Sequence, residues 1–223
     1  MSPQKIYLSV INKLNKNLGT DNITVDKPRV VLTFNENQIR RVSLILENKR
    51  DDTLREIQKL LIANSSLNKI ETKEDRVTFT LPKDYFEISS VYGLASKGTC
   101  KAKKMFLWEI KDPNYNEVLS NEHLKPSFEY QEIPYVVNNN SITVFKNDTF
   151  NIDKVFLTYY KYPTEIDIAG YVNLDNQNST DIEPELDDRF TNKVIAMTVE
   201  DFQRNYQDQL GHSMSKDRVI NNN

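Results

Sequence analysis

The sequence predicts an α+β fold: a helical bundle with an inserted, mainly antiparallel β-region and an extended C-terminal arm. Two observations lead to this prediction. Apolar residues recur with a helical period of 3.6 up to about residue 64 and again after Leu186, whereas they alternate with a period of 2 from about Arg76. The predicted strands also follow one another without the intervening helices that a doubly wound sheet requires.

This organisation divides the chain into five segments. They are the N-terminal helices (1–70), the β-region (71–163), a crossing loop (164–182), a C-terminal helix that completes the bundle (183–211), and an extended arm (212–223).

Three short helices are predicted in the first segment. Ser2 and Pro3 suit the start of the first helix and Gly19 suits its end. Thr33 and Glu36 fit a capping box for the second helix, after a linker. The second helix is expected at about 35–48 and the third at 53–63. Helices this short are marginal alone, so we expect them to pack together.

The β-region begins with "RVTFTLP", in which Val77, Phe79 and Leu81 alternate with threonines as in a half-buried strand. The segments "KKMFLWEI", "FEYQEIPYVV", "SITVF" and "KVFLTYYKY" follow, separated by turn-like spacers. They are rich in β-branched and aromatic residues, which favour strands. We therefore expect a sheet built on hairpins over about 74–162.

The C-terminal helix has an unusually wide apolar surface. Its first turns are acidic and Gly211 follows its end, both of which suit a helix. Leu186, Phe190, Val194 and Met197 share one side, and Ile195, Val199, Phe202 and Tyr206 lie roughly 100–150° away. Two interpretations remain open: a helix buried in its own domain, or one that contacts its own core on one side and a neighbouring subunit on the other.

The last residues, "HSMSKDRVINNN", lack periodicity and have few apolar anchors. We expect them to be mobile in an isolated subunit and to become ordered against a partner. The candidate contact residues are Met214, Val219 and Ile220 as apolar anchors and Lys216 and Arg218 as charge partners.

Composition excludes several classes of protein. A net charge of −3 argues against a surface that grips phosphate everywhere. Cys100 is the single cysteine, so no intramolecular disulfide framework exists. No signal peptide or membrane-spanning run is recognisable, and we expect a soluble protein made in a reducing cytoplasm.

Catalytic chemistry is hard to find. His123 and His212 are far apart in sequence, and none of the five glycines forms a G-x-G phosphate loop. The segment 175–183 resembles a calcium loop but lacks its central glycine and ligand spacing, so a solvated loop is the better interpretation. The acids Glu183, Glu185, Asp187 and Asp188 suit a helix start. We expect no catalytic, cofactor-binding or metal-binding residue, and no enzyme.

One basic cluster stands out in "SKGTCKAKK": Lys97, Lys101, Lys103 and Lys104. The simpler interpretation is a solvated hairpin loop. The alternative is a local patch that contacts DNA or a partner's acidic surface without reading base sequence. Trp108 follows and is expected in the core.

The order of these segments resembles that of a phage virion protein, most closely the head-to-tail connector, adaptor or ring proteins of short-tailed, crAss-like bacteriophages. The resemblance covers nearly the whole chain. Its marks are "LPKDYFEI" leading into the β-region, an aromatic strand ending in Tyr160-x-x-Pro163, an acidic-capped helix ending near Gln209, and a loose arm.

The resemblance implies a non-enzymatic virion subunit, about twelve copies of which form a ring in the portal, neck or tail, with a channel for DNA. It implies portal or neighbouring ring proteins as partners, and the arm from Met214 as the docking element. The residue-level interface hypothesis comprises the lysine cluster, Phe202, Tyr206 and the arm residues. The alternative function is a nucleic-acid-associated or peptide-binding accessory domain that acts through the lysine cluster.

Overall fold

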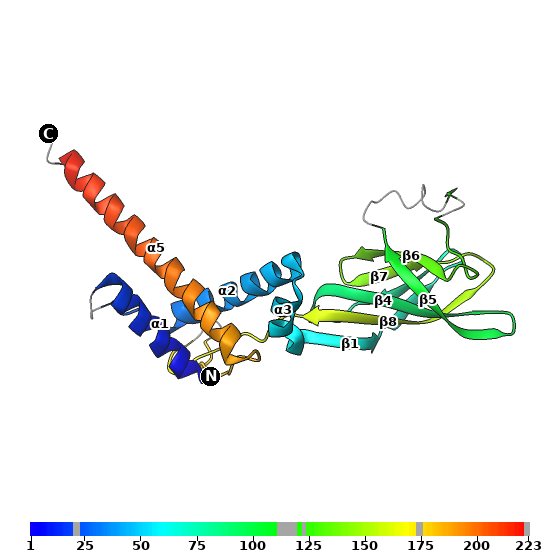
Figure 1. Ribbon diagram of the computed structural model, residues 1–223, viewed down its shortest axis with the longest axis horizontal. Helices are drawn as coiled ribbons and strands as arrows, with labels where there is room; N and C mark the ends of the chain where they lie inside the picture. The colour runs from blue at the N-terminus through cyan, green and yellow to red at the C-terminus, as the bar shows by residue number, and fades with distance from the viewer. Residues whose placement is uncertain (20–22, 111–119, 122–123, 173–175, 221–223) are drawn as a thin grey trace. The chain divides into compact units, whose positions relative to one another are not determined.

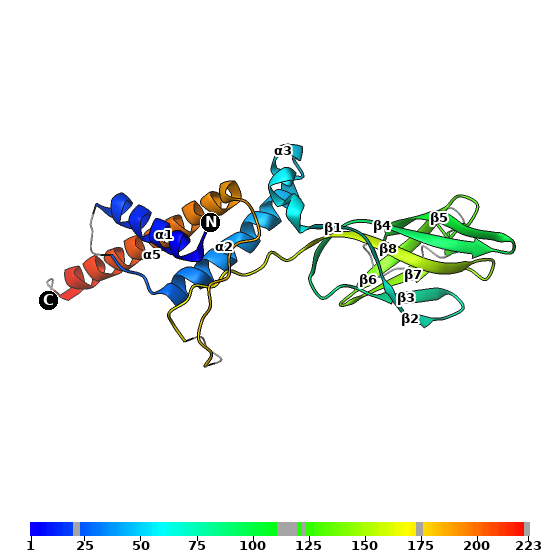
Figure 2. The same cartoon turned by 90° about the horizontal axis from the view of Figure 1, so that it is seen from below.

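The computed structural model describes residues 1–19, 23–110, 120–121, 124–172 and 176–220 (Figures 1 and 2). The chain folds into two compact units. The helical unit comprises Met1–Lys59 and Pro163–Asn223, and the sheet unit comprises Leu60–Tyr162. The sheet unit is therefore an insertion in the helical unit.

Helices α1, α2 and α5 pack together in the helical unit, with α5 against both of the others. The helical elements are α1 (Pro3–Leu18), α2 (Lys27–Asn48), α3 (Asp51–Leu54), the 3-10 helix η1 (Arg55–Leu60) and α5 (Asp188–Ile220).

Local chemistry places the ends of α1 as the sequence indicates, but α2 begins earlier. Gly19 follows α1 in the left-handed conformation (φ 65°), which a glycine adopts without strain. Asp26 occupies the N-cap position of α2 without a side-chain capping hydrogen bond, and Pro28 lies in the first turn, where the missing N–H costs nothing. The predicted capping box at Thr33 and Glu36 is wrong, because both residues lie inside α2.

The core of the helical unit is built from all three long helices and the crossing segment. Its fully buried members include Ile6, Val10, Leu14, Val30, Phe34, Val42, Ile166, Ile168, Phe190, Val194, Ile195 and Phe202. Both apolar sides of α5 are covered over residues 190–202, because α5 packs against α1 and α2. In this segment α5 is a helix buried within its own unit.

The sheet unit holds one curled eight-stranded sheet with the order β1-β8-β4-β5-β6-β7-β3-β2. The strands are β1 (Leu61–Ser66), β2 (Asn68–Thr72), β3 (Arg76–Thr80), β4 (Tyr85–Lys97), β5 (Cys100–Glu109), β6 (Glu132–Asn138), β7 (Ser141–Phe145) and β8 (Asn151–Lys161). Neighbouring strands run antiparallel except β5 and β6, which are parallel.

The inner face of the curled sheet forms the core of the sheet unit. Alternate residues of the long strands point inward, including Val91 and Ala95 on β4, Met105 on β5, and Val155 and Leu157 on β8. The two edge strands, β1 and β2, are consecutive in the chain. Leu67 joins them, and its N–H donates to the carbonyl of Val155 on β8 (2.9 Å).

The predicted α+β fold class, with three short N-terminal helices, a hairpin-built β-region and an extended C-terminal arm, is wrong. The protein is a mixed α/β protein rich in β-structure, and the described residues form four α-helices, only one of which follows the sheet. The third predicted helix is short, since residues 61–63 already belong to β1. The hairpin expectation fails at β5 and β6, where the connection between Glu109 and Glu132 is long enough for a crossover to a parallel strand.

The extended arm is the other error. Residues 212–220 continue α5 as a helix instead of forming an arm. Elongating an existing helix costs far less than nucleating one, and a glycine inside a helix costs only about 1 kcal/mol. The sequence predicts a helix stop at Gly211, but the helix passes through it.

Candidate interaction surfaces

The four clustered lysines lie on the β4–β5 hairpin but do not form one patch. Lys97 makes an ion pair with Glu129, and Lys103 donates to the carbonyl of Phe128 (2.9 Å). Both ammonium groups lie over the Phe128 ring, at 5.8 and 4.7 Å from its centroid. These two lysines therefore have partners within the sheet unit.

Lys104 and Lys101 are placed differently. The Lys104 ammonium lies 4.4 Å from the centroid of the Tyr92 ring, on the outer face of the sheet, and Lys101 is exposed at the start of β5. The hydrogen bond from Lys97 is the largest influence that lowers the pKa of the Glu129 carboxyl. The cluster is thus divided between the two faces of the sheet, which weakens it as a single anion-binding site.

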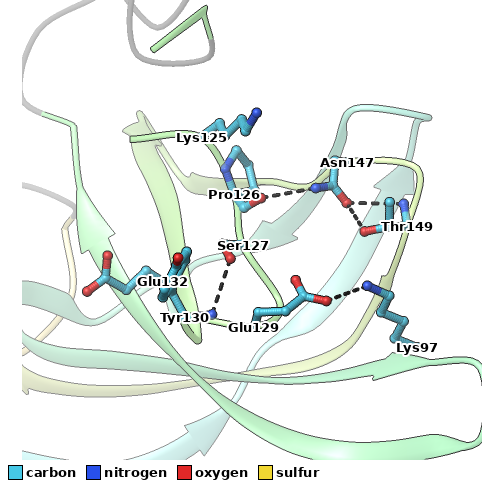
Figure 3. Close-up of a pocket in the computed structure, with 9 residues that line it drawn as sticks. All are labelled: Lys97, Lys125, Pro126, Ser127, Glu129, Tyr130, Glu132, Asn147 and Thr149. Atoms are coloured by element: carbon cyan, nitrogen blue, oxygen red, sulfur yellow. Dashed lines mark hydrogen bonds and ion pairs between the residues drawn. The ribbon is translucent and has the colours of Figure 1, made fainter. Parts of the chain in front are cut away.

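A polar hollow of about 500 Å³ lies beside Lys97 (Figure 3). Asn147 links two other lining residues. Its Nδ2 donates to the carbonyl of Pro126 (3.0 Å), and its Oδ1 accepts from the backbone N–H of Thr149 (3.1 Å). The charged groups of its lining balance one another. They are Lys97, Lys125, Glu129 and Glu132.

An aromatic surface adjoins this hollow on the outer face of the sheet. Phe106, Tyr92 and Phe156 are cross-strand partners on β5, β4 and β8, and the rings of Tyr92 and Phe156 are stacked at 5.0 Å. A second hollow of about 540 Å³ is lined by Tyr92, Lys104 and Phe106 among others. Tyr130, which is 83% exposed, lines both hollows and lies where they meet.

The helical unit carries a more apolar depression, which we call the α2 groove, of about 700 Å³. It lies between α2 and the crossing segment that follows Pro163. Leu32 and Val172 are 61% and 59% exposed in it. Its lining residues are Pro28, Arg29, Val31, Leu32, Asn35, Glu36, Ile39, Glu165, Tyr171 and Val172.

Hydrogen bonds from α2 hold the crossing segment that forms one wall of the α2 groove. The buried Asn35 amide donates to the carbonyl of Ile166 (3.1 Å), and its oxygen accepts from the Ile166 N–H (2.9 Å). Gln38 donates to the carbonyl of Thr164 (2.9 Å), and Lys27 to that of Ala169 (2.6 Å). The crossing segment is therefore a built wall of the helical unit.

The same segment is tightened by its own acidic side chains. Asp167 accepts hydrogen bonds from the Tyr171 hydroxyl and from the Thr180 N–H (3.2 Å). Burial, followed by the hydrogen bond to Asp167, raises the pKa of Tyr171 to about 12. Asp181, in the calcium-like sequence, accepts from the Ala169 N–H (2.8 Å). Among the described residues, no group of three potential metal ligands comes together.

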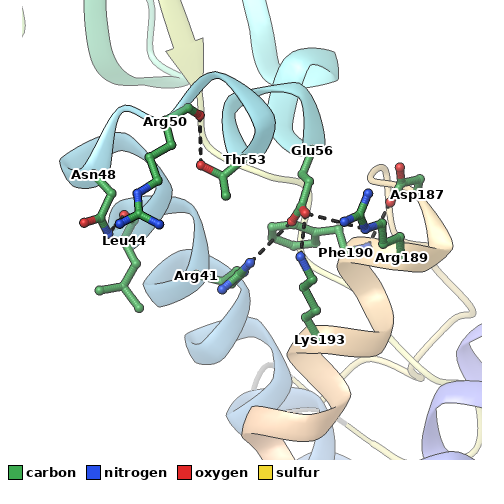
Figure 4. A network of polar contacts seen from close by, with 10 residues as sticks. All are labelled: Arg41, Leu44, Asn48, Arg50, Thr53, Glu56, Asp187, Arg189, Phe190 and Lys193. Atoms are coloured by element: carbon green, nitrogen blue, oxygen red, sulfur yellow. Dashed lines mark hydrogen bonds and ion pairs between the residues drawn. The ribbon is translucent and has the colours of Figure 1, made fainter.

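A buried carboxylate joins η1 to α2 and α5 (Figure 4). Glu56 on η1 accepts a hydrogen bond from Lys193 and one from Arg41 (3.4 Å), and Arg189 lies 3.7 Å away. Burial opposes ionisation of Glu56, but the hydrogen bonds and charges of Lys193 and Arg41 outweigh it. The pKa therefore lies below its ordinary value of 4.5. This network secures the end of the helical unit from which the chain enters the sheet.

The remaining predicted site residues lie on α5 or outside the described residues. Phe202 is 1% exposed, and the Arg29 guanidinium lies over its ring (5.6 Å), so its side chain belongs to the core. Tyr206 is half-buried. His212 and the five arm residues Met214, Lys216, Arg218, Val219 and Ile220 all fall within α5. His123 lies outside the described residues, and Trp108 is half-buried on β5.

The acids that precede α5 act at a helix start. Asp187 accepts a hydrogen bond from the Phe190 N–H (2.9 Å), which is the contact expected of an N-cap. Glu185 accepts at its side chain from Thr164 (3.1 Å) and at its carbonyl from Lys59 (3.3 Å). These contacts give a structural role to Asp187 and Glu185, two of the four acids.

Sequence reasoning missed the α2 groove and the amides that build it. Asn35 and Gln38 lie on the stripe Val31, Asn35, Gln38 and Val42, whose spacing marks a core face. A polar side chain at a core position must be hydrogen-bonded. That spacing is the signal that could have predicted a buried polar contact here.

No protein-family model matches this chain, and no curated protein matches it in sequence. Within the described residues, none of the helices combines the length and the apolar character that crossing a membrane needs.

Proposed function

We propose that this chain is a structural virion protein, a subunit of an oligomeric ring in the portal, neck or tail of a short-tailed bacteriophage, and that it is not an enzyme. DNA passes through the ring without being read in sequence. The proposal rests on the resemblance in segment order and on one surface of the helical unit.

The observation that carries the proposal is the α2 groove. Its lining is mainly apolar, and Leu32 and Val172 are more than half exposed in it. Monomeric soluble proteins rarely leave contiguous apolar surface of this kind uncovered, and such surfaces mark protein contacts. A neighbouring subunit is the cover that a ring supplies.

Ring formation follows if the surface that fills the groove lies elsewhere on the same chain. A contact between two different surfaces is head-to-tail, and repeated head-to-tail contacts close into a ring when the rotation allows. The copy number of about twelve and the portal as a partner come from the resemblance.

The test is the mass of the purified full-length chain, measured by light scattering over a range of concentrations, with electron microscopy of any assembled species. We expect a closed ring of about a dozen copies, alone or when the portal protein is present. A chain that stays monomeric at every concentration and does not join its portal would contradict the proposal.

A second candidate function is a peptide-binding accessory domain. The two hollows that meet at Tyr130 favour it, because exposed tyrosines are frequent anchors at protein contacts. Three lysines and two glutamates line the pair of hollows, a near-neutral balance that suits a peptide better than a polyanion. Titration with a labelled oligothymidylate and with a labelled proline-rich peptide would distinguish a polyanionic ligand from a peptide ligand. Tyr130→Ala is the control variant.

A further inference from the structure

We infer that a hollow at the C-terminal end of α2 binds a phosphate group through the guanidinium groups of Arg41 and Arg50. The hollow has a volume of about 270 Å³ and lies within the helical unit. Two of its six lining residues are arginines and none is acidic, although the chain as a whole has a net charge of −3. The lining residues are Arg41, Leu44, Ile45, Asn48, Arg50 and Thr53.

Helical spacing and a sharp turn bring the two arginines to the same hollow. Arg41, Ile45 and Asn48 follow one another at intervals of four and three residues, so they share one face of α2. Lys49 ends the helix in the left-handed conformation (φ 47°). After this turn, the Arg50 side chain lies back along the end of α2, beside Asn48 (Figure 4).

The backbone of Arg50 is fixed without any ligand. Its carbonyl accepts hydrogen bonds from the Thr53 N–H (3.1 Å), the Thr53 hydroxyl (2.9 Å) and the Leu54 N–H (2.9 Å). The Arg50 side chain is exposed and forms no ion pair or hydrogen bond with any described residue. A cation on a fixed backbone, with all its donors available, is suited to bind an anion from outside the chain.

Arg41 is only partly used by its contacts within the chain. It donates to Glu56 through one Nη atom at 3.4 Å, which is long for a charge-assisted hydrogen bond, and its Nε is buried without a partner among the described residues. Glu56 has a closer partner in Lys193, and Arg189 lies 3.7 Å from the same carboxylate. Three cations therefore share one carboxylate, which leaves positive charge at Arg41 for a second anion.

The two arginines are not needed to cap α2. Basic side chains near a helix C-terminus often hydrogen-bond to its last carbonyls. Here the Leu44 carbonyl accepts from the Asn48 amide (2.7 Å), and the Ile45 carbonyl accepts from the Lys49 N–H (3.0 Å). Capping of these carbonyls therefore does not account for the arginines in the hollow.

The chemistry of two guanidinium groups favours phosphate over a carboxylate. Each guanidinium donates in pairs to carboxylate or phosphate oxygens. A carboxylate has two oxygens and satisfies one such group, whereas a phosphate has enough oxygens and charge for both. Asp51 and Asp52 follow Arg50 directly, but both are exposed and lie outside the lining of the hollow. The phosphate is either a free ion or part of a nucleic-acid backbone.

Calorimetric titration of the full-length chain with inorganic phosphate at low ionic strength tests the site. Arg50→Gln and Arg41→Gln should each weaken binding about tenfold, because each removes charge-assisted hydrogen bonds. Arg50→Lys keeps the charge but loses the planar group, so it should weaken binding less than Arg50→Gln does. Raised salt should weaken binding to the unaltered chain.

Arg55→Gln is the matched control. Arg55 is exposed on η1 and lies outside the lining of the hollow, so this change removes the same charge nearby and should alter phosphate affinity by less than about twofold. Arg41→Gln also loses the contact with Glu56, whereas the Arg50 side chain has no partner in the fold, so Arg50→Gln carries the test if Arg41→Gln unfolds. If the unaltered chain does not bind phosphate, or if Arg55→Gln and Arg50→Gln weaken binding equally, the inference is wrong.

A labelled DNA duplex distinguishes the two sources of phosphate. If its affinity falls in Arg50→Gln but not in Arg55→Gln, the hollow takes a phosphate of the nucleic-acid backbone. If only the binding of inorganic phosphate depends on Arg50, the ligand is the free ion. Both results support a phosphate site. The inference goes beyond the ring function and does not depend on assembly, so these titrations decide it whether or not the chain forms a ring.

Discussion

Asn35 and Ile166 are joined by two reciprocal hydrogen bonds: the Asn35 amide donates to the Ile166 carbonyl and accepts from the Ile166 N–H. The Asn35 side chain thus makes the two hydrogen bonds to the Ile166 backbone that a neighbouring strand would make in a sheet. The backbone groups of Ile166 are satisfied by this amide, which lets this residue of an irregular connection be buried beside α2.

Asn35→Ala should destabilise the helical unit by about 2–3 kcal/mol. The change removes both hydrogen bonds and leaves two backbone groups of Ile166 buried without partners, and each such group costs about 1–3 kcal/mol, not additively. The measurement is the free energy of unfolding from urea titration.

Asn48→Ala is the control for this change. Asn48 also lies on α2, but it is exposed and its amide donates only to the local Leu44 carbonyl (2.7 Å). It should change the free energy of unfolding by less than about 0.5 kcal/mol. Equal losses of unfolding free energy in the two variants would show that the hydrogen bonds between Asn35 and Ile166 do not stabilise the helical unit.

Glu56→Gln should destabilise the chain at neutral pH and reduce its sensitivity to acid. The folded-state pKa of Glu56 is lowered, so the stability it contributes is complete above its ordinary pKa of 4.5 and is lost as the pH falls through the lower folded-state pKa. At pH 7 the loss should be about 1–3 kcal/mol, because three cations lose their buried counter-charge.

The difference in free energy of unfolding between the unaltered chain and Glu56→Gln should therefore shrink between pH 5 and pH 3, roughly the range in which a glutamate titrates. Glu129→Gln is the comparison, since Glu129 makes its ion pair at an exposed site and should leave stability unchanged. A pH-independent difference for Glu56→Gln would mean that shape rather than charge holds this network.

Lys103→Ala should cost about 1 kcal/mol, whereas Lys101→Ala should have no measurable effect. Lys103 is half-buried, donates to the Phe128 carbonyl and lies over the Phe128 ring, which together are worth about that much. Lys101 is exposed on the same strand. Thermal unfolding of the two variants is the measurement, and equal midpoints would show that the contacts of Lys103 are not stabilising.

Phe202→Ala should cost roughly 3–5 kcal/mol, because a fully buried ring is removed from between α5 and α2. Its effect on assembly should follow from lost folding alone. Chemical denaturation gives the loss of stability. A variant that unfolds like the unaltered chain but fails to assemble would return Phe202 to the subunit contact that the sequence suggested.

Local chemistry was enough to place α1, since Pro3 and Gly19 mark its ends directly. It was not enough at Thr33 and Glu36, where a good capping pattern lies inside a longer helix that begins at Lys27 and has Pro28 in its first turn. Burial against α1 and α5 stabilises the earlier turns of α2. A pattern that is correct for an isolated segment is overridden when tertiary packing extends the helix.

Non-local features lay beyond single-sequence reasoning. The pairing of β5 with β6 depends on a crossover whose course no local spacing specifies. The division of the lysine cluster depends on strand register: Lys103 shares the inward parity of Met105, and Lys104 shares the outward parity of Phe106. The β5–β6 pairing and the faces of the lysines both depend on how each strand aligns with its neighbours. Alternation along one strand shows which residues share a face, but it does not show which face is the inner one.

The pairing of β1 with β8 has a mechanical consequence. Leu61 and Tyr160 are partners in this antiparallel pair, so the chain enters and leaves the sheet unit at the same end of two adjacent strands. A force that pulled the two units apart would act on both strands from that end. It would open their hydrogen bonds one after another, as in unzipping, rather than load them all together in shear, and the Leu61–Tyr160 end would give way first.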